Sequence, residues 1–442
     1  MIFAVLVGAL ILLRIGLFLY FIMIEGQYMS DDSPMYIALA NNLLEHQVFS
    51  TSIQPPFEYD VFRTPGFPAF LALLAYLGME SFYWVSFWQE IIYCSCIWFF
   101  YRYSLSLFDE KIVKAGVIFL LIESGGFAYP KLILSEILFL PFFMASLLLI
   151  GHYLKKLDWR YLALSGFIMG LGTLVRPALL YFPIVICLTL IAFDFSSKQR
   201  WLHSGLLLLI IAVTVSPWLI RNQQHFGKLF ISGQQSNMFA NYHVPIMWES
   251  AKGIPFWEGQ KIIAHQVDSA IKQQEKQQGK ALTLIETYKV QQAIAFKELV
   301  QYPEDYAKQW LFGILKTMMG MNLTELYQTI YVQPNRVHFF DIQELNFFNK
   351  VFKFLKAQDK FVLLAVILRG MIAVFALLGA LAIIARKDCF LWIMMLANFY
   401  FICIPGPMGY SRFRFPVEVF WFIQAYFGFI WLMSYWHKPT QQ

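Results

Sequence analysis

Carboxylates and arginines at the ends of apolar segments are the residues in this sequence that could do chemistry. Asp31 and Asp32 follow directly on the apolar segment Met1 to Ile24. A carboxylate can take a proton from a hydroxyl group as a general base, and the planar donor fork of an arginine suits a phosphate. A carboxylate centre surrounded by cations at a membrane surface therefore suggests an anionic lipid donor and a hydroxyl or amine acceptor.

The other candidate residues share the same setting, because most of them lie at the end of an apolar segment beside a Pro or Gly. Together with the two aspartates they are Asp31, Asp32, Arg63, Lys131, Glu136, Arg176, Arg221, Arg412 and Arg414. Taken singly, each could be a helix cap or an anchor in the headgroup layer. Anchors should populate both faces of a membrane, so the placement of all these residues on one face favours a shared site.

The segment after Asp32 has the pattern of a helix that lies on the membrane surface. Tyr36, Leu39 and Ala40 recur at helical spacing. Acidic side chains and a proline such as Pro34 both suit a first helical turn. A capped interfacial helix without any chemistry is the alternative interpretation of this segment.

The composition indicates a membrane protein. The chain has 442 residues, of which 59% are hydrophobic, 18% aromatic and only 14% charged. The net charge of +6 is spread along the chain without a long basic run. We interpret it as loop charge and attraction to anionic lipids, not as nucleic-acid binding. The 5 cysteines lie in apolar runs without metal-ligand spacing and are expected to be inert thiols.

The hydropathy pattern predicts an all-α polytopic membrane protein with about ten transmembrane helices, juxtamembrane helices and one large non-cytoplasmic insert. The expected spans are Met1 to Ile24, Tyr83 to Leu107, Ile112 to Phe127, Ile137 to Tyr153, Tyr161 to Val175, Leu179 to Phe193, Trp201 to Ile220, Phe361 to Ile384, Leu391 to Ile404 and Val417 to Trp436. Phe67 to Met79 and Gln309 to Met319 are apolar but short, so neither is expected to cross fully.

The basic loops predict the orientation of these spans. The loops at 111–114, 155–160 and 198–200 are rich in Lys and Arg and are assigned to the cytoplasmic side. The breaks that carry the candidate residues then fall on the opposite face, provided that Phe67 to Met79 does not cross. Within the insert, Ile262 through Lys297 is expected to form one soluble helix.

Three parts follow from this order. Residues 1–222 form a seven-span catalytic membrane module with its first outer loop at 26–66. Residues 223–359 form the non-cytoplasmic insert, and residues 360–442 form a C-terminal three-span module.

Five short pieces of sequence occur in an order that is typical of one superfamily. They are Asp32 to Tyr36 with Ala38 and Ala40, Arg63 to Pro68, Pro130 with Leu134 to Glu136, Leu174 to Pro177, and Pro217-Trp218 with Arg221-Asn222. In this order they resemble the GT-C glycosyltransferases that use polyprenyl-phosphate sugars. The nearest branch is that of protein O-mannosyltransferases and of bacterial transferases that add aminoarabinose to lipid A. Arg412 to Pro416 resembles the end of many members, whereas 223–359 has no motif to place.

The resemblance implies roles for the candidate residues. The catalytic base of such enzymes follows the first helix, and its distance from the tyrosine maps it onto Asp32. Many members carry an acid directly after this base, whereas here Ser33 follows and Asp31 precedes. Either aspartate therefore remains a candidate base, and Glu136 is a candidate second acid. The candidates for the donor phosphate are Arg63, Lys131, Arg176, Arg221, Arg412 and Arg414, and those for the donor or acceptor pocket are Tyr36 and Tyr129.

These implications predict an inverting membrane glycosyltransferase in a bacterial inner membrane, with its active site facing the periplasm. The expected partners are a polyprenyl-phosphate sugar lipid, an envelope glycan, lipid A or protein acceptor, and membrane lipids, with no nucleic acid. No motif demands a cofactor. A divalent cation would find its ligands in Asp31 and Asp32.

A non-catalytic role is the alternative. A lipid-linked oligosaccharide flippase, a polymerase partner or a transporter would also be a polytopic membrane protein. A transporter should carry paired ionisable groups near mid-membrane and an internal repeat. Arg14 and Glu90 are the main ionisable residues inside spans, and the sequence shows no repeat.

Overall fold

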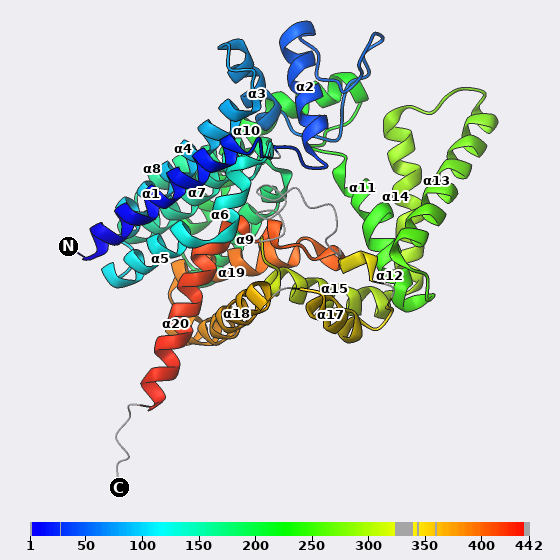
Figure 1. Cartoon of the computed structure of the whole chain (residues 1–442). Helices are drawn as coiled ribbons and strands as arrows, with labels where there is room; N and C mark the ends of the chain where they lie inside the picture. The colour runs from blue at the N-terminus through cyan, green and yellow to red at the C-terminus, as the bar shows by residue number, and fades with distance from the viewer. Residues whose placement is uncertain (1, 27, 323–338, 343, 359, 437–442) are drawn as a thin grey trace.

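The computed structural model describes residues 2–26, 28–322, 339–342, 344–358 and 360–436, and Figure 1 shows that they form a bundle of helices. The one extended feature in these ranges is an isolated antiparallel bridge between Ser50 and Tyr59. The predicted all-α class is therefore confirmed.

The membrane bundle contains most of the apolar sequence. Among the described residues, 5 helices are long and apolar enough to cross a membrane. They are α1 (Ile2–Met23), α7 (Glu136–Lys156), α10 (Lys198–Phe226), α18 (Lys360–Arg386) and α20 (Glu418–Trp436). α5 (Glu110–Ile122) and the segment made of α6 (Ser124–Ala128) and the turn Tyr129–Lys131 are together long and apolar enough for one broken span or a re-entrant loop, with a bend of 51° between them.

The remaining expected spans correspond to four further helices. These are α4 (Phe82–Ser104), α8 (Trp159–Val175), α9 (Phe182–Phe193) and α19 (Cys389–Cys403). The last three are apolar but shorter than a comfortable span. The ordered alternation of these helices with loops confirms a polytopic membrane protein.

Small residues let the two C-terminal long helices touch. A side chain added at Gly379 of α18 would lie 1.8 Å from the carbonyl oxygen of Gln424 in α20, and one at Gly428 would lie 1.9 Å from that of Phe375. Such close backbone approach is how helices associate in lipid, where hydrophobic burial supplies no driving force. The middle of α20 therefore packs against α18, whereas Figure 1 shows the C-terminal end of α20 projecting beyond the bundle.

Two short helices lie at the end of the bundle where the candidate residues gather. The first, α2 (Ser33–His46), is the helix expected after Asp32, and the second, α3 (Gly66–Tyr76), matches the short apolar segment that was not expected to cross. Gly66 lets α3 start in close contact with the end of α8. A Cβ atom at this position would lie only 2.8 Å from the carbonyl oxygen of Leu174, so any larger residue would clash there.

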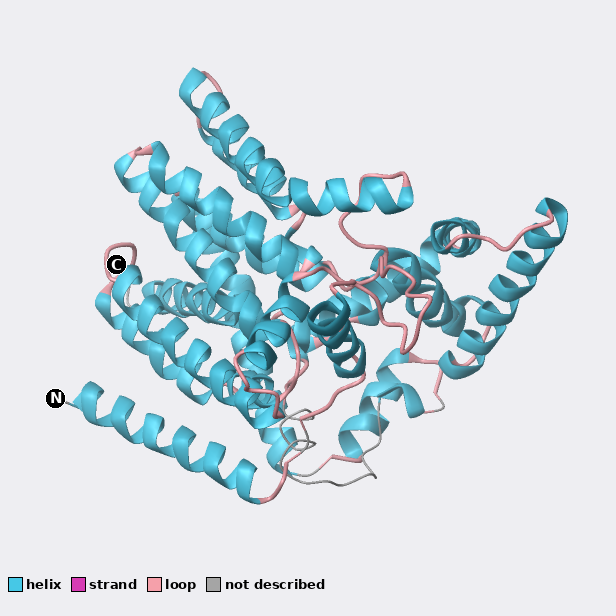
Figure 2. Ribbon diagram, turned by 90° about the horizontal axis from the view of Figure 1, so that it is seen from above, coloured by secondary structure: helices cyan, strands magenta, loops and turns pink. Residues whose placement is uncertain are grey.

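The insert forms a helical layer beside this end. It contains α11 (Gln234–Met238), a π-helical turn (Phe239–His243), α12 (Val244–Ala251), α13 (Phe256–Gln278), α14 (Leu284–Gln301), α15 (Pro303–Met319) and α17 (Phe347–Lys356). Figures 1 and 2 show α13 and α14 projecting away from the bundle. The expectation of one helix from Ile262 to Lys297 is wrong, because α13 ends at Gln278 and is followed by Gly279, whose φ of 67° is left-handed.

A buried ion pair holds α1 to the bundle, although most of the apolar side chains of α1 are exposed toward the membrane. Arg14 donates to Glu90 in α4 from Nε at 2.9 Å and from Nη2 at 2.5 Å, and it also donates to the carbonyl oxygen of Gly126 at 2.6 Å. The guanidinium lies 4.6 Å from the ring centres of Tyr93 and Phe127. The two ionisable residues that the transporter alternative singled out are therefore paired with each other.

This pair generates a stability prediction. Glu90→Gln leaves the Arg14 charge buried without its carboxylate, and we expect it to cost about 3–5 kcal/mol. Thermal unfolding in detergent measures the cost. The control is Glu110→Gln, which breaks the exposed pair with Lys114 and should barely change the melting temperature. Equal shifts for the two variants would contradict the assignment of Arg14 as the anchor of α1.

Candidate functional site

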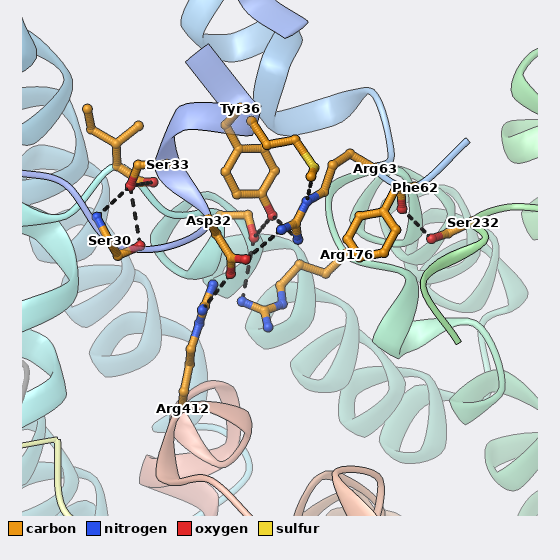
Figure 3. Close-up of polar contacts among 12 residues, drawn as sticks. Ser30, Asp32, Ser33, Tyr36, Phe62, Arg63, Arg176, Ser232 and Arg412 are labelled. Carbon is orange, nitrogen blue, oxygen red and sulfur yellow. Dashed lines mark hydrogen bonds and ion pairs between the residues drawn. The ribbon is translucent and has the colours of Figure 1, made fainter. Parts of the chain in front are cut away.

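Asp32 is held between two guanidinium groups that come from distant parts of the chain. Its Oδ1 accepts a hydrogen bond from Nη2 of Arg63 at 2.5 Å. Its Oδ2 accepts one from Nη1 of Arg412 at 2.7 Å, although the two residues are 380 positions apart. Figure 3 shows Arg63, Arg176 and Arg412 pointing toward Asp32 from three segments. The fold therefore joins the loop after α1, the loop before α3 and the turns before α20.

Glu136 extends this arrangement into the bundle. It is the first residue of α7 and is fully buried, and its Oε1 is ion-paired with both Arg176 and Arg412. Its Oε2 is buried and has no hydrogen-bond partner within the described ranges. Arg412 consequently bridges Asp32 and Glu136. We call the set Arg63, Asp32, Arg412, Glu136 and Arg176 the Asp32 network.

The Asp32 network carries an excess positive charge, because three guanidinium groups face two carboxylates. The Nη2 atoms of Arg176 and Arg412 donate to no residue in the described part of the chain, and neither is enclosed by protein. Side-chain exposure is 13% for Arg176, 15% for Arg412 and 28% for Asp32. Positive charge and open donors at a partly exposed site suit an anion such as a phosphate.

Neighbouring residues fix the direction of Arg63. The backbone amides of Phe62 and Arg63 both donate to Oδ1 of Asp60 at 2.9 Å, which shapes the turn before α3. The Arg63 guanidinium lies 4.7 Å from the ring centre of Tyr36, and its Nη1 donates to the Tyr36 hydroxyl at 3.3 Å. That hydroxyl is also 3.3 Å from Oγ of Ser135. Tyr36 therefore borders the Asp32 network.

The electrostatics keep Asp32 ionised. Burial alone would raise the pKa of its carboxyl group, but the charges of Arg412 and Arg63 and their hydrogen bonds bring it well below the ordinary value of 3.8. In the same way, the two carboxylates outweigh burial and raise the pKa of Arg412. Asp32 is therefore an anion at neutral pH, and both of its oxygens accept hydrogen bonds from arginine in this structure.

Besides Tyr36, which borders it, five of the sequence candidates lie outside the Asp32 network: Asp31, Lys131, Tyr129, Arg221 and Arg414. Asp31 is exposed beside it. Lys131 is buried and donates from Nζ to the carbonyl oxygen of Phe127 at 2.7 Å. Tyr129 donates from its hydroxyl to Oδ1 of Asn322 at 2.8 Å. The structure does not bring these side chains onto Asp32.

Arg221 binds the backbone of the first outer loop. Its Nη1 donates to the carbonyl oxygen of Asp60 at 3.0 Å, and its Nη2 donates to that of Phe49 at 3.4 Å. Its guanidinium lies 4.7 Å from the ring centre of Trp218. Arg221 thus supports the loop that presents Arg63 and does not reach Asp32 itself.

Arg414 also binds backbone. It donates from Nη1 to the carbonyl oxygens of Thr317 and Met318, the latter at 2.6 Å, and from Nη2 to that of Gly320 at 2.8 Å. Its Nε donates to Glu418 at 2.9 Å. Arg414 is fully buried, so it lies behind the site and not at its surface.

The insert contributes a residue that the sequence did not single out. Burial raises the pKa of the Tyr242 phenol, and the charges of Asp32 and Asp31 raise it further. Tyr242 lies in the π-helical turn Phe239–His243, and the field of both aspartates therefore reaches this turn of the insert. No motif or spacing in 223–359 could have indicated this proximity.

A divalent cation would have to compete for Asp32. Both oxygens of Asp32 already accept hydrogen bonds from arginine. Within the described ranges, no group of three or more His, Cys, Asp and Glu side chains is arranged to hold a metal ion. Asp31 and Asp32 alone would supply too few ligands for a protein-enclosed site.

Comparisons with solved structures give similarities at low identity. Oligosaccharyltransferase AglB from Archaeoglobus fulgidus, solved with an inhibitory peptide and a dolichol-phosphate, is 14% identical with a TM-score of 0.49; the match covers 93% of this chain and 47% of that one. ArnT from Cupriavidus metallidurans, solved with undecaprenyl phosphate, is 13% identical with a TM-score of 0.43, covering 95% of this chain and 77% of that one. The chain thus spans about half the length of AglB. Comparison with curated proteins gives no match.

A family model matches the region that supplies most of the site. The model describes dolichyl-phosphate-mannose-protein mannosyltransferases and matches residues 62–220. This region contains Arg63, Glu136 and Arg176, three members of the Asp32 network. The resemblance to the branch of GT-C glycosyltransferases that includes the protein O-mannosyltransferases is thereby confirmed over residues 62–220.

Proposed function

We propose that this protein is an inverting glycosyltransferase that moves a sugar from a polyprenyl-phosphate donor to an acceptor of the cell envelope. The acceptor is a glycan, lipid A or a protein, and the reaction takes place on the periplasmic face of a bacterial inner membrane. The basic loops assigned to the cytoplasmic side support this orientation. The Asp32 network supports the chemistry more directly than any other feature.

The Asp32 network offers both of the groups that such a reaction needs. Asp32 is an ionised and partly exposed carboxylate, which suits a general base. The open nitrogens of Arg176 and Arg412 lie beside it and suit the donor phosphate. Glu136 is ion-paired with both of these arginines and fully buried, so its role is to hold them in place.

The reaction is a single displacement at the anomeric carbon. The acceptor oxygen forms a bond to this carbon on the face opposite the phosphate, while the bond from carbon to phosphate oxygen breaks and its electron pair leaves with the lipid phosphate. Asp32 takes the proton of the acceptor hydroxyl. The arginines neutralise the charge that develops on the leaving group, and each such donor is worth about 2.7–4 kcal/mol in enzymes where it has been removed.

Donor binding also tunes the base. Arg412 pairs with Asp32 through one terminal nitrogen, and a phosphate that binds the same guanidinium shares its charge. The pKa of Asp32 then rises, because the pull of Arg412 weakens and a second anion is nearby. Asp32 is thus a better proton acceptor when donor is present than when the site is empty.

The insert shapes the acceptor side of the site. The charges of Asp31 and Asp32 act on Tyr242 in this insert, so we expect an acceptor that approaches Asp32 to meet this turn. Residues 1–222 accordingly supply the base and two of the arginines. The insert 223–359 supplies the acceptor side of the site, and residues 360–442 supply Arg412.

Replacing the proposed base gives the first test. Asp32→Asn keeps the shape of the side chain but removes the proton acceptor, and we expect transfer to fall by about 10²–10⁴-fold. Transfer of radiolabelled sugar from the lipid donor in membranes of a deletion strain measures the loss. Asp31→Asn is the matched control, because it removes the adjacent exposed carboxylate. An Asp32→Asn enzyme with normal turnover would exclude Asp32 as the base, and a dead Asp31→Asn enzyme would move that role to Asp31.

Removing a cation gives a second test through pH. Arg63 lowers the pKa of Asp32, so Arg63→Gln should raise it toward the value that burial favours. A raised pKa means that Asp32 becomes protonated at a higher pH, and the variant should lose turnover on the acidic side while the wild type retains it. Rates measured from pH 4 to 8 reveal the difference. If the rates of the two enzymes fall at the same pH on the acidic side of their pH–rate profiles, the group that titrates there is not Asp32.

A further inference from the structure

A second cluster of buried charges lies behind the Asp32 network. It contains Glu123 at the bend between α5 and α6, Arg369 in α18, Glu418 at the start of α20, and Arg414. All four side chains are at most 7% exposed. Arg369 donates to Glu418 through both terminal nitrogens, at 2.8 and 3.0 Å, and approaches Glu123 at 3.5 Å. We call these four residues the rear cluster.

All three nitrogens of Arg414 already donate within the protein, and its side chain is fully buried, so it does not face an added anion. Its Nε donates to Glu418, its Nη1 to two carbonyl oxygens, and its Nη2 to a third. Burial and the neighbouring charge of Arg369 lower the pKa of Arg414 to about 10, so it stays charged at neutral pH. In contrast, Arg412 is partly exposed and keeps an open nitrogen at the Asp32 network. Arg412 and Arg414 have the same local sequence pattern, but only Arg412 presents a donor at the site, whereas Arg414 is engaged inside the protein.

The turn between them is short and internally bonded. Residues Ser411–Phe413 and Phe415–Val417 form two successive 3-10 turns, and Arg414 is the single residue that joins them. The amide of Arg414 donates to the carbonyl oxygen of Ser411 at 3.0 Å, and the amide of Val417 donates to that of Arg414 at 2.9 Å. A displacement of Arg414 would therefore carry the backbone of Arg412 with it.

The carbonyl groups that Arg414 binds belong to the C-terminal end of α15. This helix ends at Met319, and Arg414 contacts the carbonyl oxygens of Thr317, Met318 and Gly320. The last carbonyl groups of a helix lack intrahelical partners and attract cations. Through this contact the rear cluster ties the insert helix α15 to α18 and α20, and it fixes the turn that presents Arg412.

On the basis of the transferase function proposed above, we infer that Arg414 is a positioning residue that aims Arg412 at the donor phosphate, and that Arg369 and Glu418 act with it. The phosphate site requires Arg412 to point toward Asp32 and Glu136. A long side chain on an unsupported turn would pay side-chain entropy to hold that direction. The rear cluster removes this cost by fixing the turn in advance.

A double-mutant cycle on lipid binding tests this inference, with undecaprenyl phosphate titrated into the purified full chain in detergent. Arg412→Ala should weaken binding by about tenfold or more, because it removes a charged donor. Arg414→Lys keeps the buried charge but cannot make all four hydrogen bonds, and should weaken binding several-fold. In the Arg412→Ala background, Arg414→Lys should cause no further loss, because its effect passes through Arg412.

Controls separate positioning from a general loss of structure. Arg386→Gln alters an exposed arginine at the other end of α18 and should leave the affinity unchanged. Glu418→Gln repeats the cycle from the other side of the rear cluster if Arg414→Lys does not fold. A thermal shift measured on each variant reports any change in stability independently of affinity.

The outcomes are distinct. An equal loss from Arg414→Lys with and without Arg412 would overturn the inference, as would a lowered melting temperature with unchanged affinity. If Arg412→Ala does not weaken binding while the lipid still binds, there is nothing for Arg414 to position, and the phosphate site proposed at Arg412 is wrong as well. If undecaprenyl phosphate does not bind to the unmodified protein, the proposed donor class fails.

Discussion

The bridge that Arg412 makes between Asp32 and Glu136 is the constraint on which the site depends. It draws together a residue that follows the first span, a residue that begins α7 and a residue that precedes the last span. A buried carboxylate such as Glu136 is costly unless it is paired, and breaking such a pair leaves an uncompensated charge. The bundle therefore has to bring the ends of these helices to one place. The excess positive charge that remains is what a phosphate would neutralise.

The supporting elements act on the arginines more than on the carboxylates. Asp60 and Tyr36 direct Arg63, Arg221 holds the outer loop behind it, and the rear cluster holds the turn that carries Arg412. Fixed donors aimed at the place where charge develops are the usual way in which enzymes stabilise a leaving group. The arginines need these supporting contacts because a long, unsupported arginine side chain can adopt many rotamers. A short aspartate at the start of a helix has few rotamers and needs less support.

The sequence predicted the all-α membrane architecture and named several of the residues that the fold brings together around Asp32. Long apolar runs and loop charges located α1, α7, α10, α18 and α20, because these signals are local in the chain. Asp32, Arg63 and Glu136 were found because each lies at a helix end with an unusual charge. The separation of Arg412 from Arg414 could not be predicted, since both have the same local pattern and differ only in what the folded chain places against them. Tyr242 and the break at Gly279 lie in the insert, where no motif or apolar period marks the sequence.

The most direct measurement is the structure of the protein with bound undecaprenyl phosphate. We expect phosphate oxygens within hydrogen-bonding distance of Arg412 and Arg176, with Asp32 facing the position of the anomeric carbon. We also expect Arg414 to keep its contacts with Glu418 and the end of α15. A phosphate bound away from Asp32, for instance beside Lys131 or Arg221, would contradict the assignment of the Asp32 network as the transferase site.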